Sequence, residues 1–146
     1  MSLKLLFAFA MLLTCCAAVP GADAADVNDQ MEGVWIPAKG EMAGQPLPDD
    51  FLKTFKLEVK DDKYTVTING QVDKGDCKRD PAAKPKTLDI TGTDGPNKGK
   101  TIPAIYERNG DSLKVCYDIS GKERPKEFKT ADGSLQFFVE YKLQKP

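Results

Sequence analysis

Histidine is absent from all 146 residues of the sequence. It is the commonest general base and the commonest transition-metal ligand, so its absence excludes Ser-His-Asp and Cys-His catalytic arrangements and histidine-zinc sites. Cysteine is too scarce to replace it, because the four ligands of a structural zinc site would then have to include acids or a second chain. We therefore expect a protein that is not an enzyme and that uses no metal and no cofactor.

Excess charge of one sign is also missing. The chain has 21 basic and 22 acidic residues, a net charge of −1, and the two kinds are interspersed. This pattern predicts no nucleic-acid partner. The acidic pairs Asp49-Asp50 and Asp61-Asp62 are typical of solvated turns and helix starts rather than of catalytic pairs. Gly95–Thr101 precedes a predicted strand, so it is interpreted as a turn and not as a phosphate-binding loop, which would precede a helix.

The longest apolar run, residues 5–19, lies near the start of the sequence. It follows Lys4 and precedes Ala22-Asp23-Ala24, the pattern of a secretory leader with a small-residue cleavage signal. The run is shorter than the roughly 20 residues of a membrane-spanning helix. We expect a signal peptide over residues 1–24 and one exported domain over residues 25–146, in the periplasm, the cell envelope or the extracellular space. A lipid anchor at Cys15 is the less favoured alternative, because Thr14 departs from the small residues usual before such a cysteine.

Two cysteines follow the leader, Cys77 and Cys116, and they allow one intrachain pairing in a compartment that permits disulfides. The sequence does not show that their side chains converge. Two separate buried thiols are therefore favoured over a disulfide. The sequence leaves the oligomeric state open.

Apolar and polar residues alternate with a period of two along most of the domain, as in Phe55, Leu57 and Val59 against Lys56 and Glu58. Asn69-Gly70 and Asn109-Gly110 favour tight hairpin turns. A helical turn is expected only near residues 48–53, where Pro48 precedes two acids. The pattern predicts an all-β fold, a single antiparallel up-and-down barrel of about eight strands.

A family resemblance rests on several spaced motifs of this domain: Gly33-Val34-Trp35, Gly44–Pro48, Asp80-Pro81, Lys84–Lys86, Gly95–Thr101, Gly110–Tyr117 and Gly121–Pro125. Together they resemble a lipocalin-like domain family of planctomycete bacteria that has no assigned function. In lipocalins, the glycine of Gly-x-Trp permits close backbone approach and the indole plugs the barrel floor. The resemblance implies these structural roles for Gly33 and Trp35. Pro37 departs from a regular strand, so we expect the first strand to bend or break there.

Lipocalin-like barrels also set an arginine across this tryptophan. The arginines after the leader are Arg79, Arg108 and Arg124. Arg79 and Arg108 lie beside acids and turn residues, whereas Arg124 precedes Pro125, whose fixed φ would stiffen the approach to the last strand. Arg124 is therefore the candidate to stack on Trp35, with a solvated loop arginine as the alternative.

Seven aromatic residues lie on the apolar phases of the predicted strands and are the candidate ligand-binding residues: Trp35, Phe55, Tyr64, Tyr106, Tyr117, Phe137 and Tyr141. They could interdigitate and fill the barrel, which is slightly favoured, or line an open cup with tyrosine hydroxyls as orienting groups. The first functional hypothesis is therefore a lipocalin-like module that binds a small apolar molecule. The alternative is a structural or protein-interaction domain that has a filled barrel and acts through its loops, chiefly residues 118–128.

Overall fold

Strands make up most of the chain that the structure describes, residues 30–146 of a computed structural model. The expected signal peptide, residues 1–24, and the alternative lipidation site Cys15 lie outside the described residues. The strands are β1 (Gly33–Met42), β2 (Gln45–Pro46), β3 (Lys56–Lys60), β4 (Lys63–Ile68), β5 (Gln71–Asp80), β6 (Lys86–Asp94), β7 (Thr101–Asn109), β8 (Ser112–Asp118) and β9 (Gln136–Leu143).

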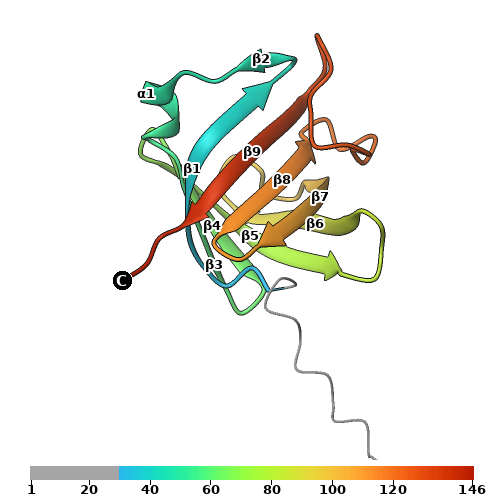
Figure 1. The fold of residues 1–146 in the computed structure, drawn as a ribbon. Coiled ribbons are helices and arrows are strands. Elements are labelled where there is room, and N and C mark those ends of the chain that lie inside the picture. The colour runs from blue at the N-terminus through green and yellow to red at the C-terminus, as the bar shows by residue number, and fades with distance from the viewer. Residues whose placement is uncertain (1–29) are drawn as a thin grey trace, which may run out of the picture.

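Sequential antiparallel pairing connects β3 through β9, and β1 pairs with both β3 and β9 (Figure 1). Because both edges of the sheet meet at β1, the eight strands β1 and β3–β9 form a closed barrel. The short strand β2 pairs only with the end of β1. The structure confirms the predicted all-β, up-and-down barrel of about eight strands.

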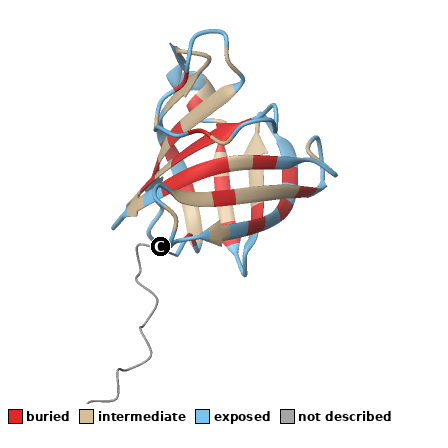
Figure 2. Cartoon of the chain, turned by 90° about the vertical axis from the view of Figure 1, so that its right-hand side faces the viewer, coloured by how far each residue is buried: buried red, intermediate tan, exposed pale blue. Residues whose placement is uncertain are grey.

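The alternation of side chains places one face of each strand inside the barrel. In β3, Leu57 and Val59 are buried while Lys56 and Glu58 are only partly covered. The same alternation of buried and exposed positions is visible along the strands in Figure 2. The buried faces form one continuous apolar core.

Three tight turns have the backbone conformation that closes two-residue hairpins. Asn69 and Gly70 both have positive φ, 50° and 77°, as expected for a type I′ turn. Asp61 and Asp62, with φ of 51° and 57°, make the same kind of turn between β3 and β4. The predicted hairpin at Asn109-Gly110 is present, but Asn109 still pairs with Ser112, so the turn residues are Gly110 and Asp111.

The expected helical turn is α1 (Asp49–Leu52), which buries Leu52 beside the end of β1. Its two aspartates lie in the first turn, where they complement the helix dipole. Among residues 30–146, no helix has the length and apolar character required to cross a membrane. Pro37 does not end β1; instead the pairing of β1 with β9 shifts register between Pro37 and Lys39.

The up-and-down order places alternate connections at opposite ends of the barrel. The closed end carries the start of β1, the β3–β4 and β7–β8 turns and the C-terminal residues. The open end carries the β4–β5 turn, the β6–β7 turn around Gly95–Lys100 and the long connection over residues 119–135. Trp35 therefore lies near the closed end.

Candidate functional site

A cavity of about 150 Å³ lies inside the barrel. Its walls are almost entirely apolar and come from the inward faces of β3 to β8 and from Phe137 of β9. Met31 contributes at the closed end, and Ile68, Asn97 and Ile119 contribute at the open end. The cavity therefore runs along the barrel from its floor toward the connections of the open end.

The seven candidate aromatic residues divide into two groups. Phe55, Tyr64, Tyr117 and Phe137 line the cavity. Trp35, Tyr106 and Tyr141 are almost completely buried, do not line the cavity and fill the core around it. The barrel is thus neither filled throughout nor an open cup, because large side chains occupy part of the interior and leave one small apolar space.

Ring contacts connect most of the wall aromatics to the packed core. The Phe137 ring stacks on Phe55 and on Tyr117, with centroids 5.9 Å apart in both pairs. Phe55 meets Tyr141 edge-on at 5.7 Å. Such pairs contribute about 0.5–1.5 kcal/mol each beyond the area that they bury. These contacts hold one side of the cavity in a fixed shape.

Three tyrosine hydroxyls in this core bond one another or Asp73: those of Tyr64, Tyr117 and Tyr141. The hydroxyl oxygens of Tyr117 and Tyr141 lie 3.1 Å apart and share one hydrogen bond. Burial raises the pKa of both tyrosines above the ordinary value, so both stay neutral at physiological pH. Burial and the bond to Asp73 likewise raise the pKa of Tyr64.

Asp73 is the charged residue in the cavity wall, and the sequence analysis did not identify it. It is 5% exposed. The Tyr64 hydroxyl donates to its Oδ2 at 2.9 Å, while the backbone N–H and the side-chain amide of Asn97 donate to Oδ1 and Oδ2, each at 3.0 Å. These bonds connect β5 to the β6–β7 turn at the open end. The sequence signal was ambiguous, because Cys77 lies on the same face of β5 as Asp73 whereas the apolar Val72 predicts the opposite phase.

Both cysteines are buried free thiols, as favoured from the sequence. Cys77 lies in the cavity wall. Cys116 donates to the Lys129 carbonyl at 3.5 Å, on the outer side of β8. Burial raises the pKa of Cys77 to about 12 and that of Cys116 to about 11.

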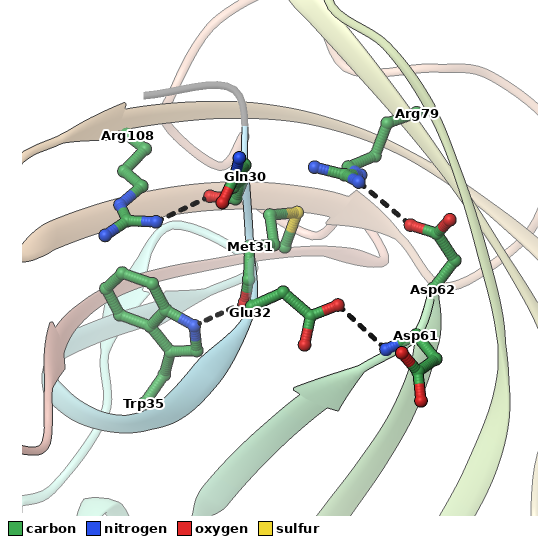
Figure 3. Close-up of polar contacts among 8 residues, drawn as sticks. All are labelled: Gln30, Met31, Glu32, Trp35, Asp61, Asp62, Arg79 and Arg108. Atoms are coloured by element: carbon green, nitrogen blue, oxygen red, sulfur yellow. Dashed lines mark hydrogen bonds and ion pairs between the residues drawn. The ribbon is translucent and has the colours of Figure 1, made fainter. Parts of the chain in front are cut away.

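The closed end is built around Trp35, whose indole is fully buried (Figure 3). Its Nε1 donates to the Met31 carbonyl at 2.8 Å. On the same short segment, the Glu32 carboxylate accepts the Asp61 N–H at 2.8 Å. The residues that precede β1 therefore cover the barrel floor together with the indole. At Gly33, φ is 131°, and a Cβ would lie 2.7 Å from Leu143 Cδ1, so a larger residue would not fit without rearrangement.

Arg108 occupies the position that the sequence analysis gave to Arg124. The guanidinium carbon of Arg108 lies 5.1 Å from the Trp35 ring centroid, within the range of cation–π contacts. Arg108 also donates to the carbonyls of Gln30 and Gly110, each at 2.9 Å. The choice of Arg124 was wrong because its connection leaves β8 at the open end, whereas Arg108 directly precedes the β7–β8 turn at the closed end.

Arg124 instead fastens the long connection to the outer side of the barrel. It donates to the Leu88 and Ala104 carbonyls of β6 and β7, at 3.2 and 2.8 Å. It also forms an ion pair with Asp89 at 2.6 Å. The Ala104 carbonyl lies four residues along β7 from Arg108, so Arg124 bonds the strands away from the contact between Arg108 and Trp35.

Two carboxylates anchor the two halves of the same connection. Asp118 accepts the N–H groups of Ser120, Lys122 and Glu123 at 2.7–3.1 Å and the Ser120 hydroxyl at 2.6 Å. Burial raises the pKa of Asp118, but these hydrogen bonds outweigh it and hold the pKa below its usual range. Glu41 of β1 accepts from the hydroxyl and N–H of Thr130, and these bonds lower its pKa.

Comparison with protein-family models, curated proteins and solved structures gives no match for this chain. In residues 30–146, no group of three or more cysteine and acidic side chains is arranged to hold a metal ion.

Proposed function

We propose that this protein is a non-enzymatic, exported, lipocalin-like module that binds one small apolar molecule inside its barrel. The observation that carries the proposal is the apolar cavity of about 150 Å³, walled by core residues of six consecutive strands and Phe137. Ligand sites are typically concave and apolar with a few polar groups that fix orientation. Here Asp73, Asn97 and Tyr64 supply those groups at one side of the cavity.

The volume limits the size of the ligand. An engineered apolar cavity of about 150 Å³ in another protein stays dry and binds benzene. A single ring or a short alkyl group therefore fits this space, whereas a long acyl chain would have to extend through the open end. Small monocyclic compounds are the first ligands to test.

Ligand binding can be tested by measuring the melting temperature and native mass of the protein with toluene and similar small apolar compounds. Binding to the folded state raises the melting temperature by mass action. Val66→Phe, in the cavity wall, should abolish the shift by filling the space. Val72→Phe is the matched control, because Val72 is 43% exposed and faces outward. No stabilisation of the unmodified protein by any compound of the series contradicts the proposal.

Export rests on the leader pattern of residues 1–24. Mass measurement of the mature N-terminus tests it. A start at Ala25 supports a free exported protein, and a lipid-bearing Cys15 supports an anchored one. A retained Met1 contradicts both.

A second candidate is protein interaction through the connection over residues 119–135. It is favoured by the anchoring of this connection at Asp118, Arg124 and Thr130, which leaves Lys122 and Glu123 exposed on a held scaffold. A pull-down from envelope extract, with the exposed residues 121–123 replaced by a glycine-serine turn, tests it. An unchanged set of captured proteins rules out this role.

A further inference from the structure

We propose that Asp73 makes the barrel selective for ligands that carry a hydrogen-bond donor and no negative charge, such as small alcohols, phenols or amines. The inference rests on the proposed ligand binding and names the class of molecule that the cavity takes.

The placement of Asp73 reverses the hydrophobic pattern of β5. Asp73 faces the interior and is 5% exposed, whereas its neighbour Val72 faces outward and is 43% exposed. Burial of a carboxylate in apolar surroundings is unfavourable unless hydrogen bonds compensate it. Here Tyr64 and Asn97 supply that compensation, and the place of Asp73 in the cavity wall also makes its carboxylate available to a bound molecule.

The hydrogen bonds of Asp73 leave room for one more donor. Oδ1 accepts one bond, from the Asn97 N–H, and Oδ2 accepts two, from Tyr64 and the Asn97 amide. A carboxylate has about four acceptor positions, so Oδ1 can accept another hydrogen bond. Asp73 and Asn97 both line the cavity, so a molecule bound there would lie beside the carboxylate of Asp73. Tyr64 and Asn97, the two residues that donate to Asp73, are uncharged and therefore do not neutralise its carboxylate.

The apolar surroundings of Asp73 Oδ1 allow it to distinguish ligands that carry a hydrogen-bond donor from ligands that carry a negative charge. A ligand hydroxyl or amine would form a charge-assisted hydrogen bond with Asp73, which is stronger than a neutral one. A ligand carboxylate would face like charge across an apolar space, where electrostatic repulsion is screened less than in water. Short-chain and aromatic carboxylates should therefore be rejected although their apolar parts fit.

A series of ligands with one ring tests this selectivity: toluene, benzyl alcohol, benzylamine and benzoate, each titrated into the folded protein at pH 7 by calorimetry. Benzyl alcohol and benzylamine should bind at least about tenfold more tightly than benzoate, the order expected when one hydrogen bond to a charged group is gained or lost. Toluene has no hydrogen-bond donor and no charge, so its affinity measures binding by the apolar cavity without a hydrogen bond to Asp73.

Asp73→Asn keeps the size of the side chain and removes its charge. It should reduce the ratio of benzylamine affinity to benzoate affinity by about tenfold or more. Asp76→Asn is the matched control, because Asp76 lies three residues along the same strand on the outer face, paired with Lys63. That variant should leave the ratio unchanged. A purely structural role for Asp73, fastening the β6–β7 turn through Asn97, would lower stability in Asp73→Asn without changing the ratio.

The outcomes separate the two proposals. If toluene binds and benzoate binds as tightly as benzylamine, Asp73 is not selective and the binding cavity stands. The same conclusion follows if Asp73→Asn binds with an unchanged ratio. If no compound of the series binds, the proposed function fails and the selectivity fails with it. The series with the unmodified protein decides the question even if Asp73→Asn does not fold.

Discussion

Arg108 joins three separate parts of the closed end through a single side chain. Its guanidinium lies over Trp35, and two of its nitrogens bond the carbonyls of Gln30 and Gly110. It thus ties the segment before β1 to the β7–β8 turn, with the indole between them. The planar guanidinium of arginine can stack on the indole and donate two hydrogen bonds at once, whereas the compact ammonium of a lysine cannot.

Arg108→Ala should lower the stability of the barrel by about 1–2 kcal/mol, from the lost cation–π contact and hydrogen bonds. Because Trp35 is the protein's one tryptophan, its emission should change in the same variant. Arg108→Lys should restore only part of the loss. Chemical denaturation followed by fluorescence measures both effects. Arg124→Ala is the control, and a change of native emission in that variant equal to that in Arg108→Ala would contradict the assignment.

The two thiols should be almost unreactive in the folded protein. With the pKa of Cys77 raised to about 12 and that of Cys116 to about 11, the thiolate fraction at pH 8 is on the order of one in a thousand or less. Reaction with iodoacetamide at pH 8, followed by intact mass, should be slow in buffer and rapid in denaturant. Fast modification of both cysteines in buffer would show that they are not buried as described.

At the scale of elements, the connection over residues 119–135 is held by polar contacts rather than by strand pairing. Asp118 fastens its start, Arg124 its middle and Thr130 its far side. The first and last of these contacts depend on an ionised carboxylate, Asp118 or Glu41, and the Arg124 contact includes an ion pair with the carboxylate of Asp89. The connection should therefore be the first part of the described chain to loosen in acid.

The pKa values of Asp118 and Glu41 are both lowered in the folded state. A depressed carboxyl pKa contributes stability above the ordinary value of about 4, and this contribution is lost as the pH falls through the folded-state value. Amide hydrogen exchange of Ser120, Glu123 and Thr130 should therefore accelerate, relative to the intrinsic rate, as the pH falls below about 4 and through the lowered pKa values. Asp118→Asn should show the acceleration at Ser120 and Glu123 already at pH 6. Protection that stays unchanged down to the acid unfolding of the barrel would contradict this anchoring.

The β4–β5 turn shows how local backbone chemistry supports the hairpin. Gly70 has φ of 77°, and a Cβ there would meet nothing within 4 Å. Gly70→Ala should therefore cost about 1 kcal/mol through backbone conformation alone. Thermal unfolding measures the change. Lys74→Ala, on the outer face of β5 and exposed, is the control and should change stability little. Equal melting temperatures for Gly70→Ala and the unmodified protein would contradict the left-handed conformation.

At the scale of the molecule, the barrel is complete only when β1 pairs with β9 from the opposite end of the domain. This long-range closure predicts slow folding, in milliseconds to seconds, because distant segments must meet before the sheet has closed edges. Unfolding should be cooperative, so tryptophan fluorescence and far-ultraviolet circular dichroism should give coincident denaturation curves. Two separated transitions would show that part of the barrel opens independently.

The fold could be predicted from the sequence because period-two alternation and Asn-Gly turns act locally. The end of the barrel at which a residue lies also follows from strand order, and that reasoning would have favoured Arg108 over Arg124. Asp73 could not be placed from the alternation of β5, because the apolar residues Val72 and Cys77 predict opposite phases. The cavity itself could not be predicted either, because it depends on how much of the core buried side chains such as Trp35, Tyr106 and Tyr141 fill, and alternation does not contain that information.

Both ends of the described chain meet at the closed end. Gln30 bonds Arg108 there, and the Gln144 N–H donates to the Val34 carbonyl at 2.7 Å (Figures 1 and 3). Any tether upstream of Gln30, including a lipid on Cys15, would therefore attach on the side of the barrel floor. A purification tag or surface linkage placed directly before Gln30 or directly after Pro146 would therefore lie at the floor of the barrel, at the opposite end from the β4–β5 and β6–β7 turns.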